Sequence, residues 1–269
     1  MTVSEKPSFS ASLLGGGMAG TAVDVALFPL DTIKTRLQSS AGFFKAGGFR
    51  GVYNGISAAA VGSAPGAALF FSSYEAAKHA MDPKSPASQM AAASIAESIA
   101  CLVRVPTENV KQKMQAGLHG SASSTVTSIL KTSGPLGFYA GYLTTVMREI
   151  PFSFIQFPIY EWLKVKLANI RGKRLESYEA ASCGSVSGAI AAGVTTPIDV
   201  VKTRIMLGKD KHGTAYRGLL QTFQRVYTEE GAAALMSGVV PRVTWISIGG
   251  FVFFGVYEAS KARLMSLGI

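Results

Sequence analysis

The stretch PLDTIKTRLQ, residues 29–38, follows the apolar run MAGTAVDVALF and ends a helix-like segment with a proline, an acid and a base. The same order returns as PTENVK at 106–111 and as PIDVVK at 197–202. In each copy one residue separates the proline from the acid, and two residues separate the acid from the base. A motif that recurs in this way marks an internal repeat of a whole structural unit.

A second motif alternates with the first. It reads tyrosine, acid, two residues, base, and it occurs as YEAAK at 74–78, YEWLK at 160–164 and YEASK at 257–261. The alternation predicts three repeats, each with one helix that ends in the proline motif and one that ends in the tyrosine motif. We expect a single domain over 1–269 with repeats at 8–82, 85–169 and 175–267.

The composition favours a membrane protein. Hydrophobic residues make up 48% of the chain and charged residues 16%, and the mean hydropathy is +0.28. Segments long enough to cross a hydrocarbon core about 30 Å thick occur at 11–30, 55–75, 88–106, 141–163, 180–198 and 239–258. They are rich in Gly, Ala and Ser and most contain a polar residue, which indicates an all-α bundle of six transmembrane helices around water.

Other classes of protein are disfavoured. The net charge is +10, but the basic residues are spread between the apolar segments, which indicates an anionic lipid surface or an anionic compartment and no nucleic acid partner. Residues 1–10 show neither a secretory signal nor a transit peptide. Cys101 and Cys183 lie in apolar segments and are expected to be packed thiols. We expect no metal, no cofactor and no catalytic residues.

Polar segments join the two helices of each repeat. In the third, GLLQTFQRVYTEEG predicts an amphipathic helix whose apolar face consists of Leu219, Leu220, Phe223, Val226 and Tyr227. A weaker version in the second repeat consists of Val126, Ile129 and Leu130. The first link is short and Gly-rich, and it gives little indication of a helix.

The repeated charges have two readings. An acid and a base three residues apart can simply pair on one helix. At six helix ends, however, they can also pair between neighbouring helices and close a ring at each side of the bundle. A proline removes a hydrogen bond and kinks its helix, which would bring three such ends together. Two rings that form and break in turn would make a two-gated transporter.

These motifs resemble those of the mitochondrial carrier family over essentially the whole chain. The resemblance implies a pseudo-threefold six-helix bundle in the mitochondrial inner membrane that works by alternating access. It implies a matrix ring of the pairs Asp31–Lys111, Glu108–Lys202 and Asp199–Lys34. Family members brace this ring with a glutamine nine residues after each proline, where Gln38 and Gln115 match and Met206 does not.

The same resemblance implies a second ring on the cytosolic side. Its pairs would be Glu161–Lys78, Glu258–Lys164 and Glu75–Lys261, and its braces would be Tyr74, Tyr160 and Tyr257. In the family, the starts of the even-numbered helices hold cardiolipin, and such starts are found here at YNG (53–55), YAG (139–141) and MSG (236–238).

The substrate site is expected where the three repeats differ, because the substrate itself is not threefold. At the same two positions before each acid of the tyrosine motif stand Gly62 and Ser63, Arg148 and Glu149, and Trp245 and Ile246. Asp24, Glu97, Arg104 and Arg242 are further charges at membrane depth. Each such charge costs about 2.5–3.5 kcal/mol on insertion scales, so a wet cavity or ion pairing must compensate. We predict substrate contacts from Asp24, Glu97, Arg148, Glu149, Trp245, Arg242 and Gly62.

The chemistry of these positions limits the cargo. Arg148 offers a fork of donors to a carboxylate, and Glu149 can accept from an ammonium, which together suit the head of an α-amino acid. Asp24 and Glu97 add negative charge for a further cation, and Trp245 offers a ring for stacking. S-adenosylmethionine has all three features.

Sequence details also resemble the branch of the family that carries S-adenosylmethionine: Asp24 before PLD, MREIPFSFIQFP at 147–158 and PRVTWISIGG at 241–250. This implies exchange for S-adenosylhomocysteine by a monomer surrounded by membrane lipid. Two alternatives stay open. A carrier of ornithine or another basic amino acid would use the same clamp but would have less use for Trp245. A carrier-like scaffold would be expected to lose gate charges, and all twelve are present.

Overall fold

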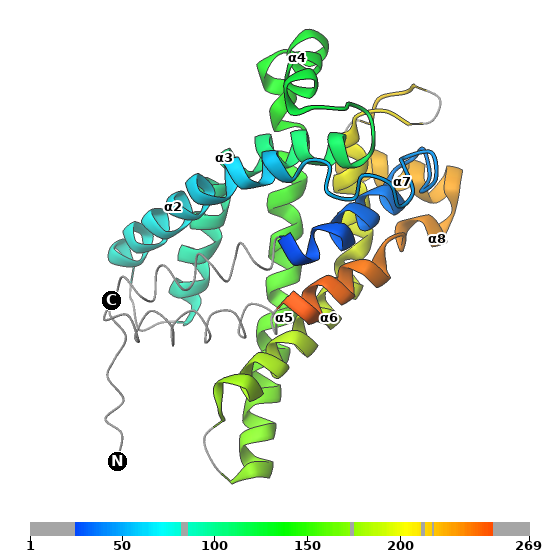
Figure 1. The fold of residues 1–269 in the computed structure, drawn as a ribbon. Helices are drawn as coiled ribbons and strands as arrows, with labels where there is room; N and C mark the ends of the chain where they lie inside the picture. The colour runs from blue at the N-terminus through cyan, green and yellow to red at the C-terminus, as the bar shows by residue number, and fades with distance from the viewer. Residues whose placement is uncertain (1–24, 82–85, 173–174, 211–212, 217, 250–269) are drawn as a thin grey trace, which may run out of the picture. The chain divides into compact units, whose positions relative to one another are not determined.

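The computed structural model describes residues 25–81, 86–172, 175–210, 213–216 and 218–249, and its regular elements are helices (Figure 1). The named helices are α2 (Ile56–Ala80), α3 (Pro86–Gln115), α4 (Ala122–Ser133), the 3-10 helix η1 (Pro135–Tyr139), α5 (Tyr142–Arg171), α6 (Ser177–Leu207), α7 (Leu219–Glu230) and α8 (Ala232–Leu235). Residues 25–38 and 239–249 are also helical. The prediction of an all-α fold is confirmed.

The predicted membrane segments coincide with helices wherever the structure describes them. By length and composition, three helices of the described part qualify as membrane spans: Ile56–Ala80, Tyr178–Leu207 and Ala232–Gly249. Helices α3 and α5 are each 30 residues long, enough for about 45 Å at 1.5 Å per residue. Their apolar character is diluted by the charges that the sequence analysis assigned to gates and cargo.

The motif prolines stand inside their helices rather than at the ends. Pro106 lies within α3 and Pro197 within α6, and α2 contains an additional one, Pro65. Each proline leaves a carbonyl without its helical donor. Because α3 and α6 continue past their prolines, the acid and base of each motif are carried on a helix and point in fixed directions.

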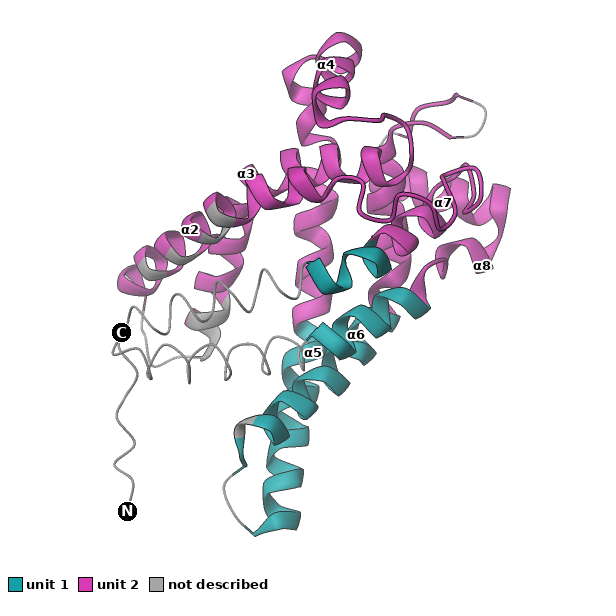
Figure 2. Cartoon of the chain, in the orientation of Figure 1, with its two compact units in different colours: residues 1–31, 154–193, 240–269 teal, residues 32–153, 194–239 magenta. Residues whose placement is uncertain are grey.

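The chain forms two compact units, and their boundaries fall within helices (Figure 2). Unit 1 consists of residues 1–31, 154–193 and 240–269, of which only part is described. Unit 2 consists of residues 32–153 and 194–239 and contains α2, α3, α4, α7 and α8 whole. The ends of the three proline-motif helices therefore belong to unit 2.

The short helix of the second repeat is present, with Ile129 buried and Val126 partly buried as expected, but Leu130 is 48% exposed. The side chain of Ser121 caps α4 by accepting from the backbone N–H of Ser124, whose side chain accepts in return from the N–H of Ser121. This reciprocal capping satisfies two donors that a helix start leaves free. Ile129 of α4 packs in a core cluster with Val110 and Met114 of α3.

The short helix of the third repeat is also present, but its predicted apolar face is divided. Val226 of α7 is buried in a second core cluster, with Val201, Tyr216 and Leu235, and Leu219 packs against that cluster. Leu220 and Tyr227 are 81% and 55% exposed. Leu220 follows Leu219 and Tyr227 follows Val226, and a step of one residue turns the side chain by about 100° around the helix. The single face expected from the sequence was therefore too wide. The first link, residues 39–55, forms turns.

The packing of α2 along α3 gives a testable prediction. A Cβ added at Gly62 would lie 2.3 Å from Oγ1 of Thr107, whereas one added at Gly66 on the same helix would meet nothing within 4 Å. We expect Gly62→Ala to destabilise the protein by about 1–3 kcal/mol through overpacking. Gly66→Ala is the matched control and should be neutral or stabilising by up to about 1 kcal/mol. Thermal unfolding in detergent measures both, and equal unfolding temperatures would refute the packing role of Gly62.

Candidate functional site

Two of the ion pairs expected between repeats are found in unit 2. Lys34, near the end of the first proline-motif helix, places Nζ 2.7 Å from Oδ2 of Asp199 on α6. Lys202 of α6 places Nζ 2.6 Å from Oε1 of Glu108 on α3. These contacts join three helices that are far apart in the sequence. The third pair of this ring, Asp31 with Lys111, stays a prediction.

One partner of each pair is shielded from water, while the side chains of Lys34 and Glu108 keep 19% and 20% of their surface exposed. Asp199 is 2% exposed and Lys202 is 3% exposed. A buried charge is strongly unfavourable unless it is paired and hydrogen-bonded. Each carboxylate must therefore find donors within the bundle as long as the helices are in this arrangement.

Gln38 provides such a donor. Its Nε2 donates to Oδ2 of Asp199 at 2.9 Å, and its Oε1 accepts from Oγ1 of Thr203 at 2.6 Å. The amide thus lies between two atoms of α6 while its backbone belongs to the helix over residues 25–38. This geometry suits the bracing role that the family resemblance implies for Gln38.

The brace positions of the second and third repeats, Gln115 and Met206, make different contacts from Gln38. Gln115 accepts from Oγ1 of Thr35 at 3.0 Å and donates to Oγ1 of Thr32 at 3.2 Å, so its amide ties α3 to the helix over residues 25–38. Met206 is completely buried and packs with Cys101 and Val105 of α3. A Cβ at Gly141 would lie 2.9 Å from Met206 Cγ, so this methionine fills space beside the start of α5.

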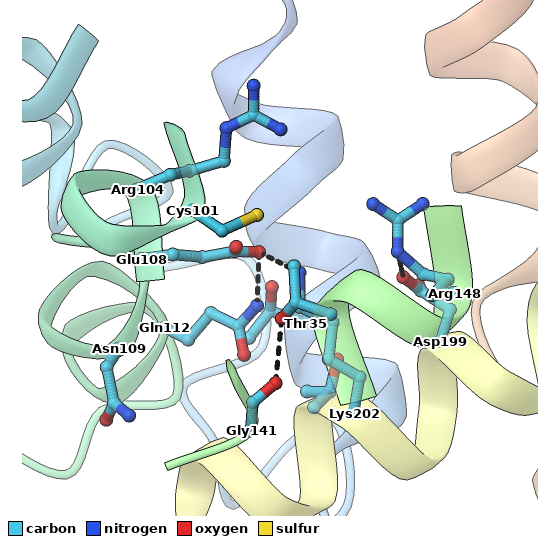
Figure 3. Close-up of polar contacts among 12 residues, drawn as sticks. Thr35, Cys101, Arg104, Glu108, Asn109, Gln112, Gly141, Arg148, Asp199 and Lys202 are labelled. Carbon is cyan, nitrogen blue, oxygen red and sulfur yellow. Dashed lines mark hydrogen bonds and ion pairs between the residues drawn. The ribbon is translucent and has the colours of Figure 1, made fainter. Parts of the chain in front are cut away.

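The predicted cargo residues Arg148 and Glu149 lie on α5 and contact each other through Arg148 Nη2 and Glu149 Oε1. Nε of Arg148 is 3.7 Å from Oδ1 of Asp199, an ion-pair distance that is too long for a hydrogen bond (Figure 3). This Nε is buried and has no hydrogen-bond acceptor among the described residues. Arg148 therefore links the cargo position to the acid that Lys34 binds.

Glu97 is also paired with a base. Its Oε1 accepts from Nη1 of Arg104 on the same helix, α3. Sγ of Cys101 is 3.8 Å from the same oxygen. Cys101 and Cys183 are buried free thiols, as expected for packed cysteines.

The remaining predicted cargo residues are placed as follows. Gly62 lies against Thr107 at the contact between α2 and α3. In unit 1, Arg242 is buried and Trp245 half-buried on the helix over residues 239–249. Asp24 lies outside the described residues. All four stay predictions as substrate contacts.

The tyrosine motifs are described only in part, and the contacts seen there lie within single helices. Lys164 places Nζ 2.8 Å from Oε1 of Glu161, three residues earlier on α5, and lies 4.6 Å from the ring centre of Tyr160. In α2, Lys78 lies 5.9 Å from the ring centre of Tyr74. Glu161 thus has a partner on its own helix. Pairing of Glu161 with Lys78 stays a prediction, as do the calls on Glu75, whose side chain is not described, and on Tyr257, Glu258 and Lys261, which lie outside the described residues.

Two buried arginines were missed by the sequence analysis. Arg36 is 1% exposed and donates to the carbonyl oxygens of Gln115, Gly48 and Arg50 at 2.7, 2.6 and 2.6 Å. It also donates to the carbonyl oxygen of Gly51 at 3.2 Å. This single side chain therefore holds the Gly-rich first link against the helices.

Arg204 is the equivalent residue of the third repeat. It forms a two-pronged ion pair with Glu230 at 2.7 and 2.8 Å, and it donates to the hydroxyl of Tyr216 at 3.2 Å. Burial raises the pKa of Tyr216 above its usual range. A signal was available: a basic residue follows each motif proline by seven positions, as Arg36, Lys113 and Arg204.

Comparison with known proteins identifies the class. A family model described as mitochondrial carrier protein matches residues 5–85, 82–171 and 173–267. The chain therefore belongs to the mitochondrial carrier family. It is a multi-pass transporter of the mitochondrial inner membrane and not an enzyme, and its fold is the six-helix carrier bundle.

The similarity extends to particular carriers. The chain is 49% identical to the mitochondrial S-adenosylmethionine carrier protein of Mus musculus, with 98% of each protein covered. It is 48% identical to the S-adenosylmethionine mitochondrial carrier protein homolog of Drosophila melanogaster, covering 96% of this chain and 94% of that protein. A putative mitochondrial carrier protein of Saccharomyces cerevisiae is 46% identical, covering 96% and 95%.

The Glu108–Lys202 pair generates a prediction about stability. Lys202→Met should lower the free energy of unfolding by about 3–5 kcal/mol, because it leaves the carboxylate of Glu108 buried without its cation. Lys209→Met removes an exposed lysine from the same segment and should change stability by less than about 0.5 kcal/mol. The exchanged variant Glu108→Lys with Lys202→Glu should recover part of the loss. Thermal unfolding of the purified carrier is the measurement, and a Lys202→Met protein as stable as the control would contradict the pair's importance.

Proposed function

We propose that this carrier moves S-adenosylmethionine across the mitochondrial inner membrane in exchange for S-adenosylhomocysteine, by alternating access between two salt-bridge gates. The observation that carries the proposal is the 49% identity, over 98% of both chains, to a protein named as an S-adenosylmethionine carrier. The chemistry of the cargo residues supports it independently.

The Arg148–Glu149 pair suits an amino acid head. The two side chains neutralise each other in the absence of cargo. The carboxylate of the cargo can pair with the Arg148 guanidinium, and its ammonium can pair with the Glu149 carboxylate. A zwitterion therefore replaces the Arg148–Glu149 ion pair by two ion pairs with the cargo. Nε of Arg148 is a buried donor without a hydrogen bond, which is unfavourable unless a ligand supplies the acceptor.

Further residues suit the rest of the molecule. Glu97 and Asp24 provide negative charge for the sulfonium, and Arg104 holds Glu97 until the cargo arrives. Trp245 provides an aromatic face for adenine. S-adenosylhomocysteine has lost the methyl group and the sulfonium charge but keeps the amino acid head and the adenine. The same Arg148 and Trp245 can therefore serve both directions of the exchange.

The ion pairs of unit 2 suit a closed matrix gate. Lys34–Asp199 and Glu108–Lys202 fasten the ends of three helices, and both pairs must separate before the cargo can leave on that side. The cytosolic acid Glu161 on α5 lies 2.8 Å from Lys164 of its own helix, and the proposed second ring would pair it with Lys78 when that side closes. Closing one ring while the other opens prevents a leak.

The proposed partners are the two cargo molecules and the surrounding lipid, including cardiolipin, and the proposed active form is a monomer. Gly55, Gly141 and Gly238 precede three helices and have positive φ angles of 93°, 82° and 77°. Glycine adopts such angles without strain, and the positive end of the following helix suits a lipid phosphate.

Transport assays distinguish the proposal from its alternatives. Proteoliposomes loaded with S-adenosylhomocysteine, with ornithine or with buffer are supplied with labelled S-adenosylmethionine outside. We expect uptake driven by S-adenosylhomocysteine and by little else. Uptake driven by ornithine alone would favour a basic amino acid carrier, and no exchange of any of these compounds would favour a silent scaffold.

Arg148→Ala provides a residue-level test. We expect S-adenosylmethionine uptake to fall at least about a hundredfold, because a buried charged hydrogen bond to the cargo carboxylate is lost. Arg50→Ala, which removes an exposed arginine of the first link, is the matched control and should transport normally. Normal uptake by Arg148→Ala would reject the clamp.

A further inference from the structure

The braces of the matrix gate are incomplete by the family's pattern. In the first repeat, Gln38 stands one helix turn after Lys34 and donates to the acid that Lys34 binds. In the third repeat, Met206 stands one turn after Lys202 and offers no donor to Glu108. The Glu108–Lys202 pair would therefore lack the hydrogen bond that the Lys34–Asp199 pair has.

A different side chain reaches Glu108. Gln112, one turn further along α3, donates from Nε2 to Oε1 of Glu108 at 2.9 Å. The same oxygen accepts from Nζ of Lys202 at 2.6 Å, so the amide and the ammonium converge on one atom (Figure 3). Gln112 is 5% exposed, so this contact is sheltered from water.

The orientation of this amide is determined by its partner. A carboxylate in an ion pair only accepts hydrogen bonds, so the NH₂ group of Gln112 must face Glu108. Its Oε1 is then buried, and none of the described residues donates to it. A buried amide oxygen without a donor is unfavourable. The bond to Glu108 therefore holds the side chain in an orientation that it would not otherwise prefer.

We propose that Gln112 is the third brace of the matrix gate and takes over the part that residue 206 would play. This inference rests on the proposed transport function, because a brace matters only if the gate opens. Gln112 is a positioning residue: it holds the carboxylate of Glu108 towards Lys202 and does not contact the cargo.

The brace favours the closed gate although Gln112 and Glu108 share a helix. In the closed state the bond is partly buried, with Gln112 5% exposed and the side chain of Glu108 20% exposed, and a hydrogen bond to a charged group is worth more there than on the open surface. When the gate opens, water reaches Glu108 and can replace the amide at little cost. Only the closed state therefore loses stability when the amide is removed.

Gln112→Met tests the proposal, since methionine keeps the length of the side chain and removes the donor. With labelled S-adenosylmethionine loaded inside proteoliposomes, we expect efflux without counter-substrate to rise about fivefold, while exchange continues. Gln38→Met is the positive reference and should give a similar or larger rise. Gln224→Met, on the exposed side of α7, is the matched control and should behave as wild type.

Restoring the missing amide gives the decisive readout. In the double variant Gln112→Met with Met206→Gln, efflux should return to within about twofold of wild type, because residue 206 bears the same relation to Lys202 as Gln38 bears to Lys34. A residue that merely stabilised α3 would not be rescued from α6. Unchanged efflux in Gln112→Met, or efflux in the double variant that stays raised, overturns the proposal.

Two further measurements keep the outcomes distinct. If Gln112→Met does not fold, Gln112→Asn replaces it, because the shorter amide cannot reach Glu108 and should raise efflux equally. If wild type transports neither cargo, the proposed function fails, and the brace is then tested by thermal unfolding of the purified protein. Gln112→Met should lower the unfolding temperature and Met206→Gln should restore it; any other pattern rejects the brace.

Discussion

The carboxylates of Asp199 and Glu108 stand on helices of a membrane protein, where a charge without a partner is strongly unfavourable. Lys34 and Lys202 satisfy them, and in both cases the partner comes from another repeat. The way in which the ends of the three proline-motif helices meet therefore depends on electrostatics as much as on packing. Arg148, which lies at an ion-pair distance from Asp199, extends the same network to the cargo position.

Ion pairs suit a gate better than apolar contacts do. A buried ion pair adds little net stability compared with well-packed apolar side chains, because desolvation offsets much of the attraction. When the pair separates into a water-filled cavity, each charge regains its hydration. Separated apolar surfaces would regain nothing comparable. The pairs Lys34–Asp199 and Lys202–Glu108 can therefore hold the helices together firmly and still separate at a modest free-energy cost.

The three repeats and the positions of the described membrane helices could be predicted from the sequence, because they follow from motifs that occur three times, and the two pairs of unit 2 follow from the family resemblance. The lengths were underestimated, since α3 covers Pro86–Gln115 where the apolar segment was 88–106. The contacts of Arg36, by contrast, are to backbone carbonyl oxygens of α3 and of the first link, and because every residue has such an oxygen, no residue type in the sequence predicts them. Glu161 shows a second limit. Its spacing permits a partner on its own helix or on the next, and sequence alone does not choose between them.

The three repeats reach similar ends with different residues. The basic residue seven positions after the motif proline has a carboxylate partner in the third repeat, Arg204 with Glu230, whereas Arg36 in the first repeat donates to carbonyl oxygens. The amide that supports an ion pair comes from the neighbouring repeat at Gln38 and from the acid's own helix at Gln112. A brace between helices must break when they part, whereas one within a helix gives way to water at little cost. The three helices of this carrier are therefore expected to separate with unequal ease, and a cargo without threefold symmetry can use that inequality to open the gate in a fixed order.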